Sequence, residues 1–326
     1  MIVFRSYILF IILGVCSVES MASGMPYVEF TKFKGEALAA VSLTFDDALP
    51  SQLTTAIPIL DQNGLSATFF IHTDNIKSTW ASTWDAWISV VAHGHEVGSH
   101  TKSHPALSEL SNARRIRDEI EGSAYYIKKN LGVKPISFAY PFSDVNDIVR
   151  RKVREVYFID RDSCRMWGGE GFTAQEGIEN IEQAVVKGEW FFCMMHGVDD
   201  DSFRPIQKNA LHEIAEYLAK HRDTIWTDTY SNVGLYNRER ILTEIKFKDV
   251  SHGGFMMRLD IPKDVRFRDH MTIPLTLSIA LDGHDVKYVK IYDDDHRIST
   301  RVSRDGNGLL IDVIPNGKWI QMYWGK

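Results

Sequence analysis

The sequence predicts an α/β fold, a barrel-like arrangement of seven strand–helix units, followed by a small all-β sandwich domain. Between residues 39 and 227, apolar runs of strand length alternate with amphipathic stretches of helical length. Continuous rather than alternating apolar strands indicate parallel strands that are buried on both faces. From about residue 240 the apolar pattern changes to a period of two, which is typical of antiparallel sheets.

The expected strands of the first part lie at 39–45, 66–72, 95–99, 136–139, 156–160, 190–195 and 224–227. Helices are expected near 53–60, 84–92, 113–131, 144–154, 175–187 and 206–220. Isoleucine and leucine side chains share one face of the helix over 113–131, and Gly132 is expected to end it. Seven units favour an irregular barrel, since a regular one has eight, and an open doubly wound sheet is the alternative.

The second part reads as a small antiparallel sandwich. Period-two segments lie at 241–247, 255–261, 273–279, 287–292, 309–314 and 319–324, and no helical pattern interrupts them. The expected division is therefore a barrel domain over residues 21–239 and a sandwich over residues 240–326.

Residues 1–20 have the pattern of a secretory signal peptide. Arg5 precedes an apolar run that is too short for a comfortable membrane span, and small and polar residues follow it. The chain is thus expected to be exported, to the periplasm or outside the cell. Lipoprotein anchoring through Cys16 is disfavoured, because Val15 is bulky where such a signal has a small residue.

The composition does not suggest a nucleic-acid or membrane partner. A net charge of -6 and a pI near 6.1 give no reason to expect nucleic acid or an anionic membrane surface. Without the leader two cysteines remain, Cys164 and Cys193, and an exported protein permits either a disulfide or a buried thiol.

Polar residues collect just after the expected strands, where parallel α/β folds carry their chemistry. Asp46 and Asp47 follow the first strand, His100 and His104 the third, and His196 the sixth. Two histidines four residues apart suit either a metal site or a pair of hydrogen-bonded surface side chains. With Asp47 they would form a set of two imidazoles and one carboxylate, which leaves positions open as a catalytic metal requires.

Five motifs carry a resemblance to a known family: TFDD (44–47), SATFFI (66–71), HEVGSHTKSHP (95–105), FAYPF (138–142) and MMHG (194–197). Their order and spacing resemble the polysaccharide deacetylases of carbohydrate esterase family four. The resemblance covers about residues 40–230, and it implies a deformed seven-stranded (β/α) barrel, in agreement with the pattern of strands and helices.

Carried over to this sequence, the resemblance implies a role for each motif residue. Asp46 matches the general base that activates the attacking water, and His196 matches the general acid. Asp47, His100 and His104 match the ligands of one divalent metal, usually Zn²⁺ and sometimes Co²⁺ or another ion. The backbone N–H of Phe142 matches the oxyanion donor, and Tyr140 is a candidate for substrate contact.

The sequence departs from the family's pattern at two places. Many members have an arginine at the start of the fourth-strand motif that braces the catalytic aspartate, and Ala139 stands there. The fifth-strand motif is looser. Asp162, with Asp160 as the alternative, is the candidate for tuning the acid histidine, and Trp167 is the candidate for the motif's substrate-binding tryptophan.

The expected function is that of an exported, metal-dependent hydrolase that removes N- or O-linked acetyl groups from a polysaccharide. The competing reading is a catalytically impaired carbohydrate-binding protein, which the missing arginine and the appended sandwich favour. The sequence leaves the roles of some aromatic and imidazole side chains undecided. Trp80, Trp84 and Trp87 suit a sugar platform or helix core, and His72 suits the pocket or the core.

Overall fold

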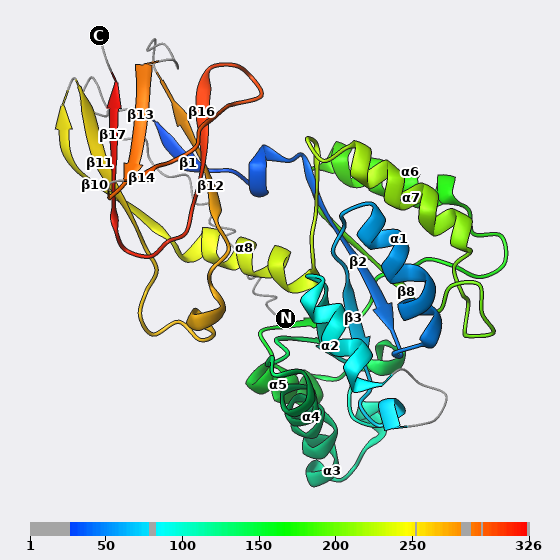
Figure 1. The fold of residues 1–326 in the computed structure, drawn as a ribbon. Coiled ribbons are helices and arrows are strands. Elements are labelled where there is room, and N and C mark those ends of the chain that lie inside the picture. Colours follow the sequence, from blue (N-terminus) through cyan, green and yellow to red (C-terminus); the bar gives the residue numbers. More distant parts are fainter. Residues whose placement is uncertain (1–26, 78–82, 252, 282–287, 295, 325–326) are drawn as a thin grey trace, which may run out of the picture.

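The computed structural model describes residues 27–77, 83–251, 253–281, 288–294 and 296–324. The expected leader and Trp80 lie outside the described residues. The described chain forms an α/β lobe and an antiparallel β lobe (Figure 1). None of its helices combines the length and apolar composition that crossing a bilayer would need.

The α/β lobe is built on a curled parallel sheet with the strand order β6-β5-β4-β3-β2-β8-β7, and β9 pairs with β2. Its strands are β2 (Ala39–Asp46), β3 (Thr68–Ile71), β4 (Glu96–Ser99), β5 (Ser137–Ala139), β6 (Ile159–Arg161), β7 (Arg165–Met166), β8 (Trp190–Met195) and β9 (Ile225–Thr227). All seven expected strands form, and the two-residue strand β7 is added to them. The prediction of an irregular parallel barrel is therefore confirmed.

Helices cover the outer side of this sheet, and their ends follow from local sequence. They are α1 (Ile57–Gln62), α2 (Trp84–Ala92), α3 (Ala113–Arg117), α4 (Ser123–Leu131), α5 (Asp147–Val156), α6 (Ala174–Lys187) and α7 (Lys208–Lys220). The side chains of Thr83, Asn146 and Thr173 accept hydrogen bonds at the N-termini of α2, α5 and α6. Gly132 ends α4 in the left-handed conformation, as expected.

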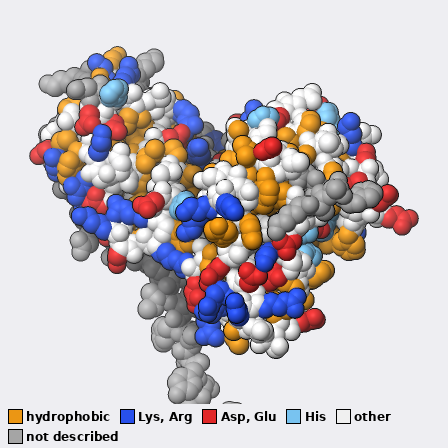
Figure 2. Space-filling model, turned by 60° about the horizontal axis from the view of Figure 1, so that its bottom comes forward, with side chains coloured by type: hydrophobic (Ala, Val, Ile, Leu, Met, Phe, Trp, Pro, Cys, Tyr) orange, Lys and Arg blue, Asp and Glu red, His pale blue; other side chains and the backbone are white. Residues whose placement is uncertain are grey.

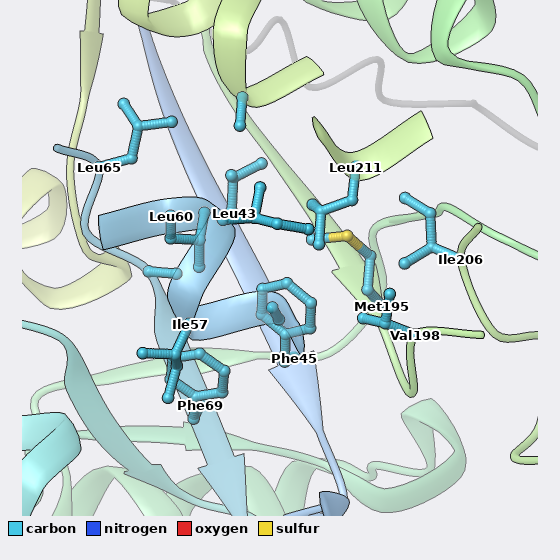
Figure 3. Packing of buried hydrophobic residues seen from close by; sticks show 14 of the residues in the cluster. Leu43, Phe45, Ile57, Leu60, Leu65, Phe69, Met195, Val198, Ile206 and Leu211 are labelled. Atoms are coloured by element: carbon cyan, nitrogen blue, oxygen red, sulfur yellow. The ribbon is translucent and has the colours of Figure 1, made fainter. Parts of the chain in front are cut away.

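The largest apolar cluster lies between the sheet and these helices. Figure 3 shows Leu43 and Phe45 of β2 beside Leu60 of α1, with Met195 of β8 and Leu211 of α7 on the other side. Trp87 is fully buried in the same cluster, so the helix-core interpretation of this tryptophan is confirmed. Because protein interiors are close-packed, burial of these side chains holds the strand ends in defined positions.

The β lobe is a sandwich of two antiparallel sheets. One has the order β1-β12-β16-β15 and the other β10-β11-β17-β13-β14. Their strands are β1 (Val28–Phe30), β10 (Glu244–Ser251), β11 (Gly254–Asp260), β12 (Leu275–Ala280), β13 (Val289–Asp293), β14 (His296–Arg297), β15 (Arg301–Val302), β16 (Gly308–Val313) and β17 (Trp319–Trp324). The N-terminal strand β1 pairs with β12, a pairing that the sequence pattern did not indicate.

A helix that the sequence pattern missed, α8 (Tyr230–Leu242), lies between the two lobes (Figure 1). It extends through residues 241 and 242, where the period-two pattern was expected to begin, so that expectation is wrong for these two residues. The helix buries side chains around most of its circumference, including Tyr230, Val233 and Tyr236. A helix packed on several sides has no single apolar face, which removes the periodicity that identifies one.

The strands β2, β3 and β8 point their C-terminal ends toward the same edge of the α/β lobe (Figure 1). Figure 2 turns that edge toward the reader and shows charged, apolar and histidine side chains intermingled on this face. The motif residues at the strand ends are therefore brought to one edge, as the parallel arrangement requires.

Candidate active site

Two adjacent carboxylates, those of Asp46 and Asp47, lie at the end of β2 and form part of the site. Asp46 is the last strand residue and is buried, whereas Asp47 leaves the strand with a φ of 80°. The backbone N–H of Asp47 still donates to the carbonyl of Phe70 on β3 at 3.1 Å, so the turn is anchored. The change of backbone conformation sends the two side chains to different partners.

Asp47 meets both histidines of the H-x-x-x-H motif. Its Oδ1 lies 3.2 Å from Nε2 of His104 and 3.7 Å from Nε2 of His100. The two Nε2 atoms are 3.2 Å apart, and one ligand atom from each of the three residues lies within 4.8 Å of the others. The structure thus brings together the three residues that were expected to bind metal.

A hydrogen bond sets which nitrogen of His100 faces this centre. Its Nδ1 donates to the carbonyl of Ala139 at 2.8 Å, which leaves the lone pair of Nε2 directed toward Asp47 and His104. Burial lowers the pKa of His100 and so favours the neutral imidazole, the form that can ligate a metal. Burial alone would raise the pKa of Asp47, but the hydrogen bond from His104 and the neighbouring imidazoles outweigh it and hold that pKa well below its usual range.

The donor set fits a divalent cation. Oδ1 of Asp47 is buried, and the Nε2 atoms of His104 and His100 face it at 3.2 and 3.7 Å. Two imidazole nitrogens that face each other at 3.2 Å are stable only with a proton or a cation between them. Two imidazoles and a carboxylate accept zinc, cobalt and other divalent ions, so the set does not select one metal.

Backbone strain is concentrated at the same place. Asp47, Thr101, His104 and Phe142 all have φ between 59° and 80°, a region that residues with a Cβ rarely adopt. Such conformations persist where the surrounding structure enforces them, and they gather at functional sites.

An arginine that the sequence analysis missed binds Asp46. Nη2 of Arg161, the last residue of β6, lies 2.6 Å from Oδ1 and 2.5 Å from Oδ2 of Asp46, and both side chains are buried. Burial alone would lower the pKa of Arg161, but the Asp46 carboxylate more than compensates and raises it. Arg161 also stacks over the ring of Phe70 at 4.9 Å and donates to Sγ of Cys164 at 3.1 Å. Cys164 and Cys193 are both free thiols.

A buried glutamine, also unforeseen, holds two strand ends together. Nε2 of Gln52 donates to the backbone carbonyl of Asp46 at 2.5 Å and to that of His196 at 3.1 Å. Because these carbonyls end β2 and β8, Gln52 fixes the spacing between the residues that match base and acid. Its signal in the sequence is weak, since a lone polar residue at the start of a helix is usually exposed.

His196 approaches a different carboxylate oxygen of Asp47 than His104 does. Its Nε2 is 3.9 Å from Oδ2 of Asp47, and its Nδ1 is buried with no hydrogen-bond partner in the described part of the chain. Neither Asp162 nor Asp160 fills that role, and the expectation that one of them tunes His196 is not met. Both carboxylates face Arg150 instead, because α5 carries this cation to the end of β6.

Two expected substrate contacts are also corrected. Tyr140 is only 2% exposed, and its hydroxyl donates to Asp160 at 3.2 Å. Trp167 is fully buried and donates to Asn180 at 3.2 Å, and its ring packs against Phe172 and Phe191. Both rings are therefore parts of the packed interior, and neither offers a face to a polysaccharide.

The neighbours of His104 are better placed for contact. Phe142 is 72% exposed, and its ring lies edge-on to that of His104 with 4.7 Å between centroids. On another side the ring of His72 lies 5.3 Å from that of His104, so this histidine belongs to the wall of the site. Burial lowers the pKa of His72 to about 4.

Comparison with known proteins agrees with the motifs. Residues 36–158 match a family model described as polysaccharide deacetylase. A gellan lyase of a Bacillus species is 20% identical over 338 residues, which are 88% of this chain and 13% of that protein. Chitin deacetylase 1 of Cryptococcus neoformans is 35% identical over 109 residues, 33% of this chain and 22% of that protein. This chain thus spans less than a quarter of either relative.

A solved structure supports the fold. The crystal structure of a putative polysaccharide deacetylase from Mycobacterium smegmatis superposes with a TM-score of 0.52 at 17% identity, over 68% of this chain and 98% of that one. The family match spans the ends of β2, β4 and β5, where Asp46, Asp47, His100, His104 and Phe142 lie. Residues 36–158 therefore match the sequence pattern of the polysaccharide deacetylase family, as the motifs implied.

Proposed function

We propose that this protein is an exported, metal-dependent hydrolase that removes acetyl groups from a polysaccharide. The observation that carries the proposal is the grouping of four side chains, those of Asp46, His100, His104 and His196, around the carboxylate of Asp47. Asp47 lies between the imidazole pair and His196, and Asp46 approaches the same centre, with Oδ2 3.8 Å from Nε2 of His100. A base, a metal triad and an acid within one cluster suit hydrolysis of an acetyl amide or ester.

Asp47, His100 and His104 would hold the cation. Once bound, a divalent cation there would polarise the acetyl carbonyl and make an attacking water more acidic. Asp46 accepts the proton of that water. Arg161 fixes the orientation of the Asp46 carboxylate and balances its charge in a buried position, because Nη2 contacts both oxygens.

Proton return and oxyanion stabilisation fall to the other two positions. His196 donates a proton to the departing amine or alcohol, since its Nε2 lies beside Oδ2 of Asp47 and so within the same cluster. The backbone N–H of Phe142 is the proposed oxyanion donor, at the turn that follows β5 and beside His104. One such donor contributes about 3–4 kcal/mol to transition-state stabilisation.

The rival function, carbohydrate binding without turnover, loses its main support. It depended on the lack of an arginine at Ala139, yet Arg161 occupies the equivalent place beside Asp46. A protein that only binds sugar has no use for a buried, charge-balanced base next to a metal triad. Export rests on the leader pattern of residues 1–20 alone.

Acetate release tests the proposal. The mature protein, loaded with zinc or cobalt, is assayed on N-acetylglucosamine oligomers and on acetylated xylan, each beside a chelated control. Chelator-sensitive release is expected, and the substrate that yields it separates amide from ester hydrolysis. Asp46→Asn is expected to bind metal with unchanged stoichiometry and to lose turnover by about 10²–10⁴-fold. Full activity of Asp46→Asn would refute the assigned base.

A further inference from the structure

The loop between β8 and α7 carries an exposed aromatic side chain next to the proposed acid. Phe203 is 66% exposed, and its ring meets that of His196 edge-on, with 5.6 Å between centroids and 85° between planes. A single exposed phenylalanine needs no explanation by itself. The construction of the loop and its position give this one a role.

The base of the loop is fixed by core packing and backbone pairing. Val198 and Ile206 are buried in the main apolar cluster near Met195 and Leu211 (Figure 3). The amide of Ile206 donates to the carbonyl of Gly197 at 2.9 Å, and the amide of Asp199 donates to the carbonyl of Ile206 at 3.0 Å. The two ends of the loop are therefore closed on each other.

A second set of contacts holds the tip. The Asp200 carboxylate accepts hydrogen bonds from the hydroxyls of Ser51 and Ser202, each at 2.5 Å, and from the amide of Ser202 at 3.0 Å. The hydroxyl of Ser202 also accepts from the amide of Gly197 at 3.0 Å. Arg204, on the other side of Phe203, donates through Nη2 to the carbonyl of Gly168 at 3.1 Å. Both neighbours of Phe203 are thus tied, so its ring is held in solvent by a braced loop.

Phe203 has a counterpart beside the imidazole pair. Phe142 packs against His104 in the same edge-on manner, and it is also exposed. His104 approaches Oδ1 of Asp47, whereas His196 approaches Oδ2. One exposed phenylalanine ring therefore stands beside the metal triad and the other beside the acid, and the two histidines that they contact approach different oxygens of the Asp47 carboxylate.

We propose that Phe203 forms one wall of a sugar-binding subsite at the mouth of the candidate active site. This inference rests on the proposed function. A pyranose ring has apolar C–H faces that pack on an aromatic face, and a neutral, acetylated glycan has no charge that needs a cation in the wall. A pre-positioned ring costs little entropy on binding, and binding energy away from the reacting acetyl group orients it for attack.

The test compares a long and a short substrate. In metal-loaded Phe203→Ala, we expect the KM for an N-acetylglucosamine or acetylated xylose tetramer to rise about 5- to 20-fold, with kcat changed much less. For the small ester 4-nitrophenyl acetate, which cannot span the subsite, kcat/KM should fall by no more than about threefold. Phe203→Trp should restore the KM for the tetramer. Tyr125→Ala, at an exposed aromatic position on α4, is the matched control and should change neither value.

Two results would overturn the inference. An unchanged KM for the tetramer in Phe203→Ala would remove the subsite, and equal losses on both substrates would mean that Phe203 merely supports His196. Failure of the proposed function is distinguishable, because the wild-type protein would then release no acetate from either substrate. Calorimetry of tetramer binding to Asp46→Asn, with and without Phe203→Ala, decides the subsite in that case, since equal affinities would exclude it.

Discussion

Arg161 contacts both carboxylate oxygens of Asp46 from a strand that is not the one on which the resemblance would place an arginine. Ala139 stands at the position where the resemblance would place the bracing arginine. Ala139 and Arg161 are register partners in the β5–β6 ladder, so the two positions are side by side at the edge of the sheet. A cation from the neighbouring strand thus reaches the carboxylate that a cation from β5 would have reached.

This pairing predicts the effect of removing Arg161. Arg161→Ala would leave Asp46 buried without its cation, which costs about 3–5 kcal/mol in the free energy of unfolding. It should also lower kcat about a hundredfold or more, because the proposed base, Asp46, loses its orientation. Thermal unfolding and acetate release measure the two effects. Metal stoichiometry should stay that of the wild type, since Asp47, His100 and His104 are untouched.

Arg161→Lys is the informative control for that variant. Lysine keeps the charge but cannot reproduce the fork of a guanidinium, so stability should recover more than kcat does. If Arg161→Ala folds with wild-type stability and turnover, Arg161 is not the brace of Asp46.

Gln52 predicts a coupling between the ends of β2 and β8. Gln52→Ala leaves two carbonyl oxygens, those of Asp46 and His196, without this donor, and should lower the free energy of unfolding by about 1–3 kcal/mol. It should also reduce kcat more than it raises KM, because the proposed base and acid are no longer held at a fixed spacing. Gln175→Ala, at an exposed position on α6, is the matched control and should be neutral in chemical denaturation and in kinetics. Equal behaviour of the two variants would contradict the proposed bridge.

Metal binding predicts a gain in thermal stability. A ligand that binds only the folded state at a hundred times its Kd adds about 2.7 kcal/mol, so zinc should raise the Tm of the chelated protein by several degrees. In His104→Ala the gain should largely disappear, because one of the three proposed ligands is missing. His93→Ala is the control, since His93 pairs with Asp61 away from the triad. A full zinc-induced shift in His104→Ala would show that the cation binds elsewhere.

The sequence predicted the parts of this molecule that repeat a local pattern. The seven buried strands are visible in the sequence as short apolar runs. The polar residues directly after them must meet at one edge of the sheet, because the strands are parallel. Asp47, His100 and His104 were placed together for this reason, and the structure brings their ligand atoms within 4.8 Å. Helix α8 was missed because it is buried on several sides, and strand β1 was missed because its partner β12 lies far along the chain.

The contacts that were predicted wrongly, or not predicted at all, depend on residues from other strands and helices. Arg161 looked like one more charged residue in a loose motif, and only the β5–β6 register puts it beside Asp46. Asp162 had the right residue type for tuning His196, but Arg150 on α5 draws it away. Trp167 and Tyr140 follow strand ends in sequence, yet they turn into the core, and which way a side chain turns there is set by packing.

The burial of Glu239 on α8, the helix between the two lobes, predicts that the stability of the protein depends on pH. Its side chain is buried, with Oε1 accepting the amide of Ile273 at 3.2 Å and Oε2 unpaired within the described residues. Burial raises the pKa of Glu239 from 4.5 to about 7. The folded state therefore keeps a proton that the unfolded chain releases above about pH 4.5. The stability that this bound proton adds is fully present below about pH 4.5. It is lost as the pH rises through about 7, and the free energy of unfolding then falls by about 2–3 kcal/mol.

Glu239→Gln keeps the hydrogen-bond acceptor and should remove this loss. Urea denaturation from pH 5 to 8 should therefore show the variant gaining stability relative to the wild type as the pH rises. Parallel pH profiles of the two proteins would mean that Glu239 titrates normally.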